Sequence, residues 1–298
     1  MTGTPMKIGL VGLGRMGRAI YARLTEQGCE VVAWDNNPGA MKAAAERQMR
    51  LADSPRAVAA FGDVVISSIT EDHGVRAIYR GADGFLSGDV KGKLFIEMST
   101  LQPMTGRELA PVVDAAGARL VDSPVFGTIP HVLQGKLYAM VGGGAEDVER
   151  ARPVLAKLAG KIAHMGPNGS GYAMKLAVNL GLAAFIQATA ESLALGTREG
   201  LKLEQMLDIL GEAPTANGWF NGKKAALKGE PAETTLDLKT MRKDIMSAVA
   251  TGTINGTSMP LSSGVLSSLS AAVAHGWGDK DIGDLAKFFR EHMGQNFT

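Results

Sequence analysis

Short apolar, β-branched runs alternate with segments of helical periodicity through the first half of the chain. The apolar runs predict six strands, at Lys7–Val11, Val31–Trp34, Val64–Ser67, Leu94–Met98, Arg119–Asp122 and Tyr138–Val141. Between the early runs lie segments with helical spacing, such as Met16–Gln27 and Gly39–Arg47. Alternation of this kind is typical of a parallel sheet with helices on both faces. We therefore expect an α/β fold, with a doubly wound, Rossmann-like dinucleotide-binding domain over residues 1–165.

The pattern changes near Gly166-Pro167-Asn168-Gly169, where strand-like runs give way to helical periodicity. The helical segments predicted beyond this point are 172–198, 203–210, 216–228, 233–251, 260–275 and 280–293. They predict an all-α C-terminal domain over residues 166–298 that serves substrate binding and oligomerisation.

The segment Tyr172–Leu195 is apolar nearly all round, a pattern that indicates burial on every side. Its polar residues are Lys175, Asn179, Gln187 and Glu191, a load that a bilayer span does not normally carry. We expect a long interdomain helix that also packs against a second subunit, in a homodimer or homotetramer. An ordinary core helix in a monomer is the alternative.

Composition and charge exclude several classes of protein. The chain has 298 residues, of which 45% are hydrophobic and 20% charged, as in ordinary globular proteins. Its formal net charge is +1, which provides no field to gather nucleic acid or acidic lipid. Cys29 is the only cysteine, and Met1 to Pro5 do not resemble a signal peptide. We expect a cytoplasmic protein without nucleic-acid, membrane or metal partners.

A glycine-rich segment follows the first predicted strand and opens a helix: Gly12-Leu13-Gly14-Arg15-Met16-Gly17. In a dinucleotide fingerprint the first glycine permits a tight turn, and the second lets a pyrophosphate approach the backbone. The third allows the helix to pack closely against the strand. The free N–H groups at the start of the helix then hold the phosphate charge. We expect these six residues to bind the cofactor.

Asp35 ends the second predicted strand, 18 residues after Gly17. A carboxylate at this place accepts hydrogen bonds from the adenosine ribose and repels a 2′-phosphate. Asn36 follows where an NADP enzyme would place an arginine. The sequence thus favours NAD over NADP, although Asp35 could also cap the helix that starts near Pro38.

Lys175 and Asn179 are four residues apart and share one face of the long apolar helix. Burial among apolar neighbours lowers the pKa of a lysine toward neutrality, where it can take and return a proton. Asn179 offers a donor and an acceptor to a substrate hydroxyl. The alternative is a lysine whose charged end reaches solvent.

With these segments in order, the chain resembles the β-hydroxyacid dehydrogenase family, which includes 3-hydroxyisobutyrate dehydrogenases and the related 6-phosphogluconate dehydrogenases. The resemblance covers nearly the whole chain. It rests on Gly9–Gly17, Met98-Ser99-Thr100 with Pro103, Asp122–Val125, Gly135-Lys136-Leu137, Val141-Gly142-Gly143, Gly169–Asn179 and Lys243-Asp244.

This resemblance implies roles for matching residues. Lys175 would be the catalytic acid/base, and Asn179 would hold the substrate hydroxyl. Thr100 and the pair Ile69-Thr70 match positions that contact the cofactor near its nicotinamide half. Lys243 matches a second lysine near cofactor and substrate. Without the resemblance, Lys243 would be interpreted as a solvated helix charge.

The segment after Pro124-Val125 departs from the family, whose hydroxyacid enzymes carry Ser-Gly-Gly there. This chain has Phe126-Gly127-Thr128, in which Gly127 allows a close backbone approach and Thr128 supplies a hydroxyl. Together with Ser123, these residues are the expected substrate-binding segment. His131 follows, and we interpret it as a residue at a helix start rather than an anion ligand.

The expected function is NAD-dependent interconversion of a small 3-hydroxy acid, itself a carboxylate, and its semialdehyde or keto acid. One alternative is NADPH-dependent reduction of an imine or an aldehyde without a carboxylate, although imine-reducing relatives generally replace the lysine. A non-catalytic dinucleotide-binding protein is the alternative from another class.

Overall fold

The computed structural model describes residues 5–230 and 234–292, and its chain divides into two compact units, residues 1–176 and 177–298. Residues 1–4, 233 and 293, which enter the sequence predictions above, lie outside the described part. We describe each unit by itself.

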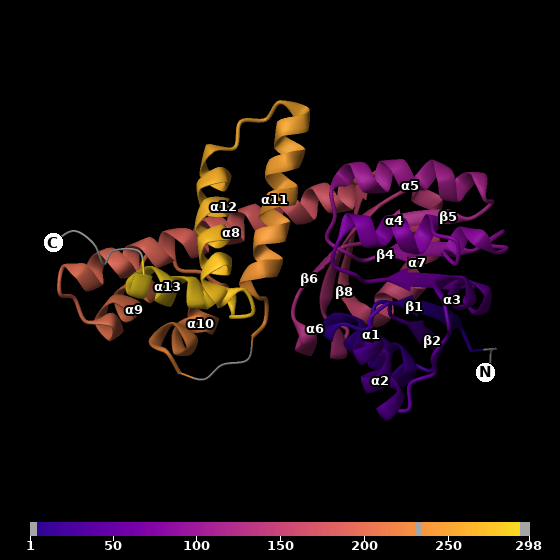
Figure 1. Ribbon diagram of the computed structural model, residues 1–298, viewed down its shortest axis with the longest axis horizontal. Helices are drawn as coiled ribbons and strands as arrows, with labels where there is room; N and C mark the ends of the chain where they lie inside the picture. Colours follow the sequence, from indigo (N-terminus) through magenta and orange to yellow (C-terminus); the bar gives the residue numbers. More distant parts are fainter. Residues whose placement is uncertain (1–4, 231–233, 293–298) are drawn as a thin grey trace. The chain divides into compact units, whose positions relative to one another are not determined.

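An eight-stranded sheet forms the centre of the N-terminal unit (Figure 1). Its strands are β1 (Lys7–Val11), β2 (Glu30–Trp34), β3 (Val64–Ser67), β4 (Leu94–Glu97), β5 (Arg119–Asp122), β6 (Val125–Phe126), β7 (Leu137–Gly142) and β8 (Ala159–Gly166). The order is β2-β1-β3-β4-β5-β7-β6, with β8 paired to β7. The first five strands in this order are parallel, whereas β7 runs antiparallel to β5.

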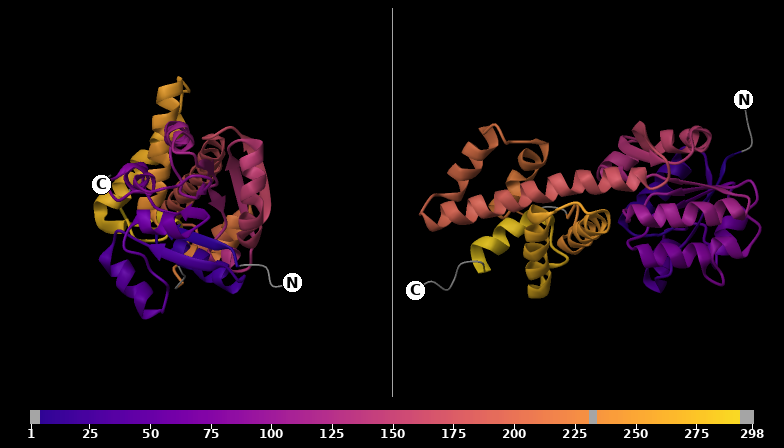
Figure 2. Two further views of the ribbon diagram at one scale, coloured as in Figure 1. Left: turned by 90° about the vertical axis from the view of Figure 1, so that its right-hand side faces the viewer. Right: turned by 90° about the horizontal axis from the view of Figure 1, so that it is seen from above.

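Helices cover both faces of this sheet (Figure 2). They are α1 (Arg15–Glu26), α2 (Pro38–Glu46), α3 (Pro55–Phe61), α4 (Asp72–Arg80), α5 (Pro103–Ala115), α6 (Ile129–Leu133) and α7 (Ala145–Leu158), with a 3₁₀ turn at Phe85–Ser87. Pattern and structure agree on the doubly wound α/β fold.

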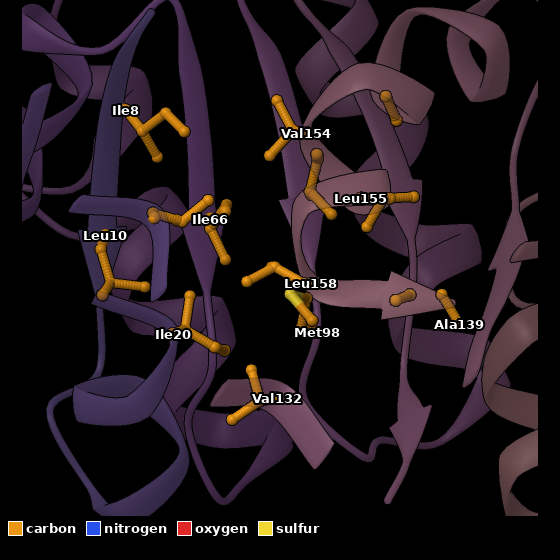
Figure 3. Packing of buried hydrophobic residues seen from close by; sticks show 14 of the residues in the cluster. Ile8, Leu10, Ile20, Ile66, Met98, Val132, Ala139, Val154, Leu155 and Leu158 are labelled. Atoms are coloured by element: carbon orange, nitrogen blue, oxygen red, sulfur yellow. The ribbon is translucent and has the colours of Figure 1, made fainter. Parts of the chain in front are cut away.

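The parallel strands β1 to β5 are buried on both faces, and alternate residues enter two different cores. On β4, Leu94 and Ile96 pack with α1, α6 and α7, whereas Phe95 packs with α3, α4 and α5. Figure 3 shows residues of the first of these cores, among them Leu10 and Ile66 of the strands and Val154 and Leu155 of α7. Burial of both faces explains why these strands read as continuous apolar runs.

The structure confirms the six predicted strands to within one residue at each end and adds two that the pattern missed. Strand β6 has only two residues, and β8 contains Gly160, Lys161 and His164, which break the apolar signal. Both lie in the part of the sheet that departs from the parallel pattern, because β6 and β5 are antiparallel to β7.

The regular secondary structure described for the C-terminal unit consists of helices, as predicted, with one isolated β-bridge between Asp237 and Asp281. Its helices are α8 (Ser170–Arg198), which begins in the N-terminal unit, then α9 (Leu203–Glu212), α10 (Gly218–Lys228), α11 (Leu238–Asn255), α12 (Pro260–Ala272) and α13 (Leu285–His292). Helix α11 starts five residues later than predicted, because the Asp237 side chain accepts the N–H of Thr240 and caps it there. Helix α12 ends in a π turn in which Gly276 has a φ of 83°.

Helix α8 is long and apolar enough to cross a membrane by length and composition alone. Ala183, Ile186, Ala190 and Leu193 are nevertheless buried in the core of the C-terminal unit. The expectation that every side would be buried is wrong for the single chain, in which Leu195, for example, is 67% exposed. The exposed side of α8 consists largely of small residues, so the helix has an apolar composition although that side faces solvent in the single chain.

Leu193→Ala tests how far this core stabilises the protein. The Leu193 side chain is fully buried, so its truncation should lower the free energy of unfolding by about 2–5 kcal/mol. The matched control is Leu261→Ala on α12, whose side chain is 64% exposed and whose effect should stay within about 0.5 kcal/mol. Urea denaturation followed by circular dichroism measures both, and equal effects would contradict the assignment of this face to the core.

Candidate active site

The turn between β1 and α1 depends on two glycines that no other residue could replace without a clash. Gly12 has a φ of +101°, and a Cβ there would lie 2.1 Å from the carbonyl oxygen of Ser68. A Cβ on Gly17 would lie 1.8 Å from the carbonyl oxygen of Gly12. These contacts are the physical reason for the first and third glycines of the fingerprint.

Gly14 is different, because a Cβ there would meet no protein atom within 4 Å. It precedes α1 as the N-cap residue and provides no side-chain cap to the helix. The first N–H groups of a helix lack intrahelical partners and lie at its positive end. Open space beside such N–H groups fits a dinucleotide pyrophosphate, and Arg15 and Met16 contribute the first residues of this helix end.

Asp35 connects the loop after β2 to the loop after β1. Its two carboxylate oxygens accept the N–H groups of Leu13, at 2.6 Å, and Asn37, at 2.8 Å. The alternative that Asp35 caps α2 is wrong, since the Asn37 side chain accepts the N–H groups of Gly39 and Ala40. Asp35 is therefore fixed in orientation at the end of its strand.

A cleft of about 490 Å³ opens at the carboxyl ends of β1, β2 and β3. Five of the predicted cofactor residues line it, namely Gly12, Asp35, Asn36, Ile69 and Thr70. Ligands of open α/β sheets bind at this end of the strands. The cleft and the helix end beside Gly14 thus fit a dinucleotide. Thr100 follows β4, is half-buried and is not among the residues that line this cleft.

The lining of this cleft is acidic. Its charged side chains include Asp35, Asp53, Glu71 and Asp83, and the described lining contains no lysine or arginine. Arg56 pairs with Asp83 at 3.0 Å and compensates one of these charges. The remaining carboxylates oppose the approach of any additional phosphate.

Buried polar side chains lie at the ends of β3 and β4. The Glu97 carboxyl accepts hydrogen bonds from the Ser67 hydroxyl and, at 3.0 Å, from the backbone N–H of Ser99. All three side chains are buried. Burial raises the pKa of Glu97 to about 7, although hydrogen bonds from Ser67 and Ser99 oppose the shift. This carboxyl therefore titrates near neutrality.

The shift of Glu97 predicts a pH dependence of stability. Between its ordinary pKa of 4.5 and the folded value of about 7, the folded protein keeps a proton that the unfolded chain has released. Stability therefore falls as the pH rises through this window, by about 3 kcal/mol, and the contribution is constant above it. Urea denaturation at pH 5 and pH 8 measures the change.

Glu97→Gln is the matched variant for this measurement because its amide does not titrate. Its stability difference between the two pH values should be smaller than that of the unsubstituted protein by about the same 3 kcal/mol. Equal pH dependence in both proteins would mean that Glu97 does not titrate in this window.

Asp122, at the end of β5, holds the start of α8. One carboxylate oxygen accepts the N–H of Gly169 at 2.7 Å, and the other accepts that of Tyr172 at 3.2 Å. Burial raises the pKa of Asp122, while these N–H groups oppose the shift. Lys175, half-buried, lies one turn after this anchored end. The anchor thus fixes the helix backbone that carries the predicted acid/base.

The segment predicted to bind substrate is partly buried. Ser123 is completely buried, whereas Phe126 is 40% exposed and packs edge-on against Tyr138 with ring centroids 4.8 Å apart. Thr128 caps α6 together with His131, whose Nδ1 lies 2.7 Å from the Thr128 hydroxyl. The interpretation of His131 as a helix-start residue is confirmed. Gly127, exposed, has a φ of 132°.

A second set of polar side chains lies in the C-terminal unit, on α8 and α11. The Asn179 amide donates to Asp244 at 2.7 Å, and the Lys243 ammonium pairs with the other Asp244 oxygen at 2.7 Å. Asn179 and Asp244 are each 3% exposed. The amide nitrogen of Asn179 carries two N–H groups, so it can donate to one further acceptor besides Asp244.

Asp244 was not among the predicted site residues, although it lies next to Lys243. A signal was present in the sequence, because Asp244 shares the buried face of α11 with Met241, Ile245 and Ala248. A carboxylate on the apolar face of a helix needs a charged or hydrogen-bonding partner. Local sequence does not identify that partner, since Asn179 is 65 residues away.

Gly14→Val tests the phosphate site. The side chain enters space that holds no protein atom, so the melting temperature should change by no more than about 2 °C while NAD affinity falls at least about tenfold. Gly17→Ala is the contrasting variant, because its Cβ would collide with Gly12 and destabilise the fold. Thermal unfolding and calorimetric titration with NAD measure the two effects. Unchanged affinity in Gly14→Val would place the pyrophosphate elsewhere.

Two family models together match most of the chain. Residues 7–166 match the NAD binding domain of 6-phosphogluconate dehydrogenase, and residues 169–289 match the NAD-binding domain of NADP-dependent 3-hydroxyisobutyrate dehydrogenase. The chain is 32% identical to a 3-hydroxyisobutyrate dehydrogenase of Pseudomonas aeruginosa, over 85% of this chain and 88% of that protein. It is 29% identical to an NAD-dependent L-serine dehydrogenase of the same organism, over 97% and 99%.

A solved structure agrees with these relatives. The Mycobacterium tuberculosis 3-hydroxyisobutyrate dehydrogenase with L-serine is 30% identical, has a TM-score of 0.83, and matches 96% of this chain and 99% of its own. The sequence relatives and the solved structure thus indicate the same family over both units. The chain belongs to the β-hydroxyacid dehydrogenase family of NAD(P)-dependent oxidoreductases that act on CH–OH groups.

Proposed function

We propose that this protein uses NAD to interconvert a small 3-hydroxy acid and its semialdehyde or keto acid, with Lys175 as the acid/base. The observation that carries the proposal is on α8. Lys175 follows the end that Asp122 anchors, and Asn179 lies one turn later with its amide fixed by Asp244. An amine that accepts the hydroxyl proton and an amide N–H that donates to the hydroxyl oxygen, one turn apart, can address the same substrate hydroxyl.

A nicotinamide cofactor held in the cleft would supply or accept the hydride. In the oxidising direction, neutral Lys175 takes the proton of the substrate hydroxyl, and in the reducing direction the protonated amine returns it to the oxygen. Asn179 orients that hydroxyl by donating an amide N–H to its oxygen, while its amide also donates to Asp244. The backbone of Gly127 binds the substrate carboxylate, which fixes the distance between anion and hydroxyl. The Thr128 N–H does not take part, because it donates to His131 Nδ1 at 3.1 Å.

The relatives support this substrate class. Their names specify 3-hydroxyisobutyrate and L-serine, and both compounds carry a hydroxyl on the third carbon of a carboxylic acid. A site whose binding groups are spaced to fit a carboxylate and a hydroxyl on the third carbon can bind either compound. We therefore propose 3-hydroxy acids as the substrate class of this protein, without assigning either compound as its substrate.

The acidic cleft supports NAD over NADP. Asp35 is held at the end of β2 by two backbone N–H groups, and Asn36 beside it is uncharged. A 2′-phosphate would bring negative charge toward Asp35 without a lysine or arginine among the described lining residues to balance it. The ribose hydroxyls of NAD can instead donate to the carboxylate.

A spectrophotometric screen tests the proposal directly. The purified protein is assayed with 3-hydroxy acids, semialdehydes and cyclic imines, each with the NAD and NADP forms of the cofactor. Activity with a 3-hydroxy acid and a higher kcat/KM for NAD are expected. Activity confined to imines, or NADP used at least as well as NAD, would contradict the proposed substrate or cofactor.

Lys175→Ala should reduce kcat by at least about 10²-fold, within the range of general acid–base catalysis. NAD affinity should be nearly unchanged, because the phosphate and ribose contacts lie elsewhere in the N-terminal unit. Lys175→Arg is the matched control: it keeps the charge but remains protonated, so it should fail equally as a base. Normal turnover in either variant would remove Lys175 from the mechanism.

The proposal also includes a cytoplasmic homo-oligomer, a dimer or a tetramer. Apolar side chains that the single chain leaves exposed on α8, among them Met174 and Leu195, support association. Light scattering after size-exclusion chromatography measures the state, and a monomer at micromolar concentration would contradict this part.

A further inference from the structure

A chain of hydrogen bonds leads from the buried Glu97 to the wall of the cofactor cleft. Glu97 accepts the backbone N–H of Ser99 at 3.0 Å. The Ser99 hydroxyl oxygen in turn accepts the backbone N–H of Ile69 at 2.9 Å. Ile69 and its neighbour Thr70 line the cleft. The carboxyl of Glu97 therefore braces the loop after β3 although it touches no solvent.

The strand order indicates which half of a dinucleotide this loop faces. Asp35 at the end of β2 marks the adenosine ribose, and the glycine turn after β1 marks the pyrophosphate. Strands β3 and β4 lie on the other side of β1 from β2. A dinucleotide that spans the carboxyl ends of these strands has its second nucleoside over β3 and β4.

We propose that Glu97 is a positioning residue that, through Ser99 and Ile69, fixes the cleft wall against the nicotinamide half of the cofactor. This inference rests on the proposed function, because it requires a nicotinamide dinucleotide in the cleft. Glu97 does not touch the reacting atoms. Its role is to hold the backbone of the cleft wall at Ile69.

The hydrogen bonds of Glu97 persist in both of its protonation states. The ionised carboxylate accepts from the Ser67 hydroxyl and the Ser99 N–H. The neutral acid still accepts from Ser99 and donates its own proton to the Ser67 oxygen. The other titratable groups near Glu97 are Asp122, Tyr79 and Tyr172, all buried.

A glutamine can reproduce this arrangement, because its carbonyl oxygen accepts from Ser99 and its amide donates to Ser67. Leucine has a similar size but leaves the Ser99 N–H without its acceptor, which is costly in a buried site. Glu97→Gln and Glu97→Leu are therefore a matched pair that separates hydrogen bonding from volume.

The experiment compares two ligands, NADH and ADP-ribose, the second of which lacks the nicotinamide. In Glu97→Leu the Kd of NADH should rise at least about tenfold while that of ADP-ribose stays within about twofold. Glu97→Gln should keep both values within about threefold of the unsubstituted protein. Calorimetric titration measures all six constants, and circular dichroism establishes that each variant is folded.

Ser99→Ala provides a second route if Glu97→Leu fails to fold. It removes the acceptor for the Ile69 N–H and leaves Glu97 in place. The same selective loss of NADH affinity is expected.

Equal weakening of both ligands in the folded variants would assign Glu97 a general structural role and overturn the inference. Unchanged NADH affinity in Glu97→Leu or Ser99→Ala would also overturn it. These failures are distinct from failure of the proposed function, in which the unsubstituted protein itself would bind neither ligand.

Discussion

Carboxylates at the carboxyl ends of three parallel strands hold the backbone of the loops around the candidate site in the N-terminal unit. Asp35, the residue after β2, accepts N–H groups from the glycine turn and from its own loop. Glu97 on β4 accepts the N–H of Ser99, and Asp122 on β5 accepts those at the start of α8. Charge-assisted hydrogen bonds of this kind are stronger than neutral ones. Each of these carboxylates fixes backbone N–H groups that lie beyond the end of its strand.

Burial of these carboxylates lowers the free energy of unfolding relative to apolar side chains at the same positions. Glu97 and Asp122 are buried among apolar residues, and burial raises the pKa of both. Well-packed apolar side chains at these positions would often stabilise a fold as much or more. Their retention is consistent with a site that requires fixed loops, since strained or costly groups are concentrated where function requires them.

Features that depend on residues close together in the sequence could be predicted from the sequence. The parallel strands have continuous apolar runs because both faces are covered, and Gly12 and Gly17 occupy positions where a Cβ would collide with the backbone. Strand β8 was missed because its glycine and charged residues hide the pattern. The pairing of Asn179 with Asp244 joins two helices, and no local pattern identifies such a contact.

The ion pair between Lys243 and Asp244 has a consequence for how a substrate reaches this part of the protein. The ammonium lies 2.7 Å from a buried carboxylate, so the pair presents little net charge to distant solutes. A chain with a net charge of only +1 adds no broad field. An anionic substrate would then arrive by unsteered diffusion, and its association rate should depend only weakly on ionic strength.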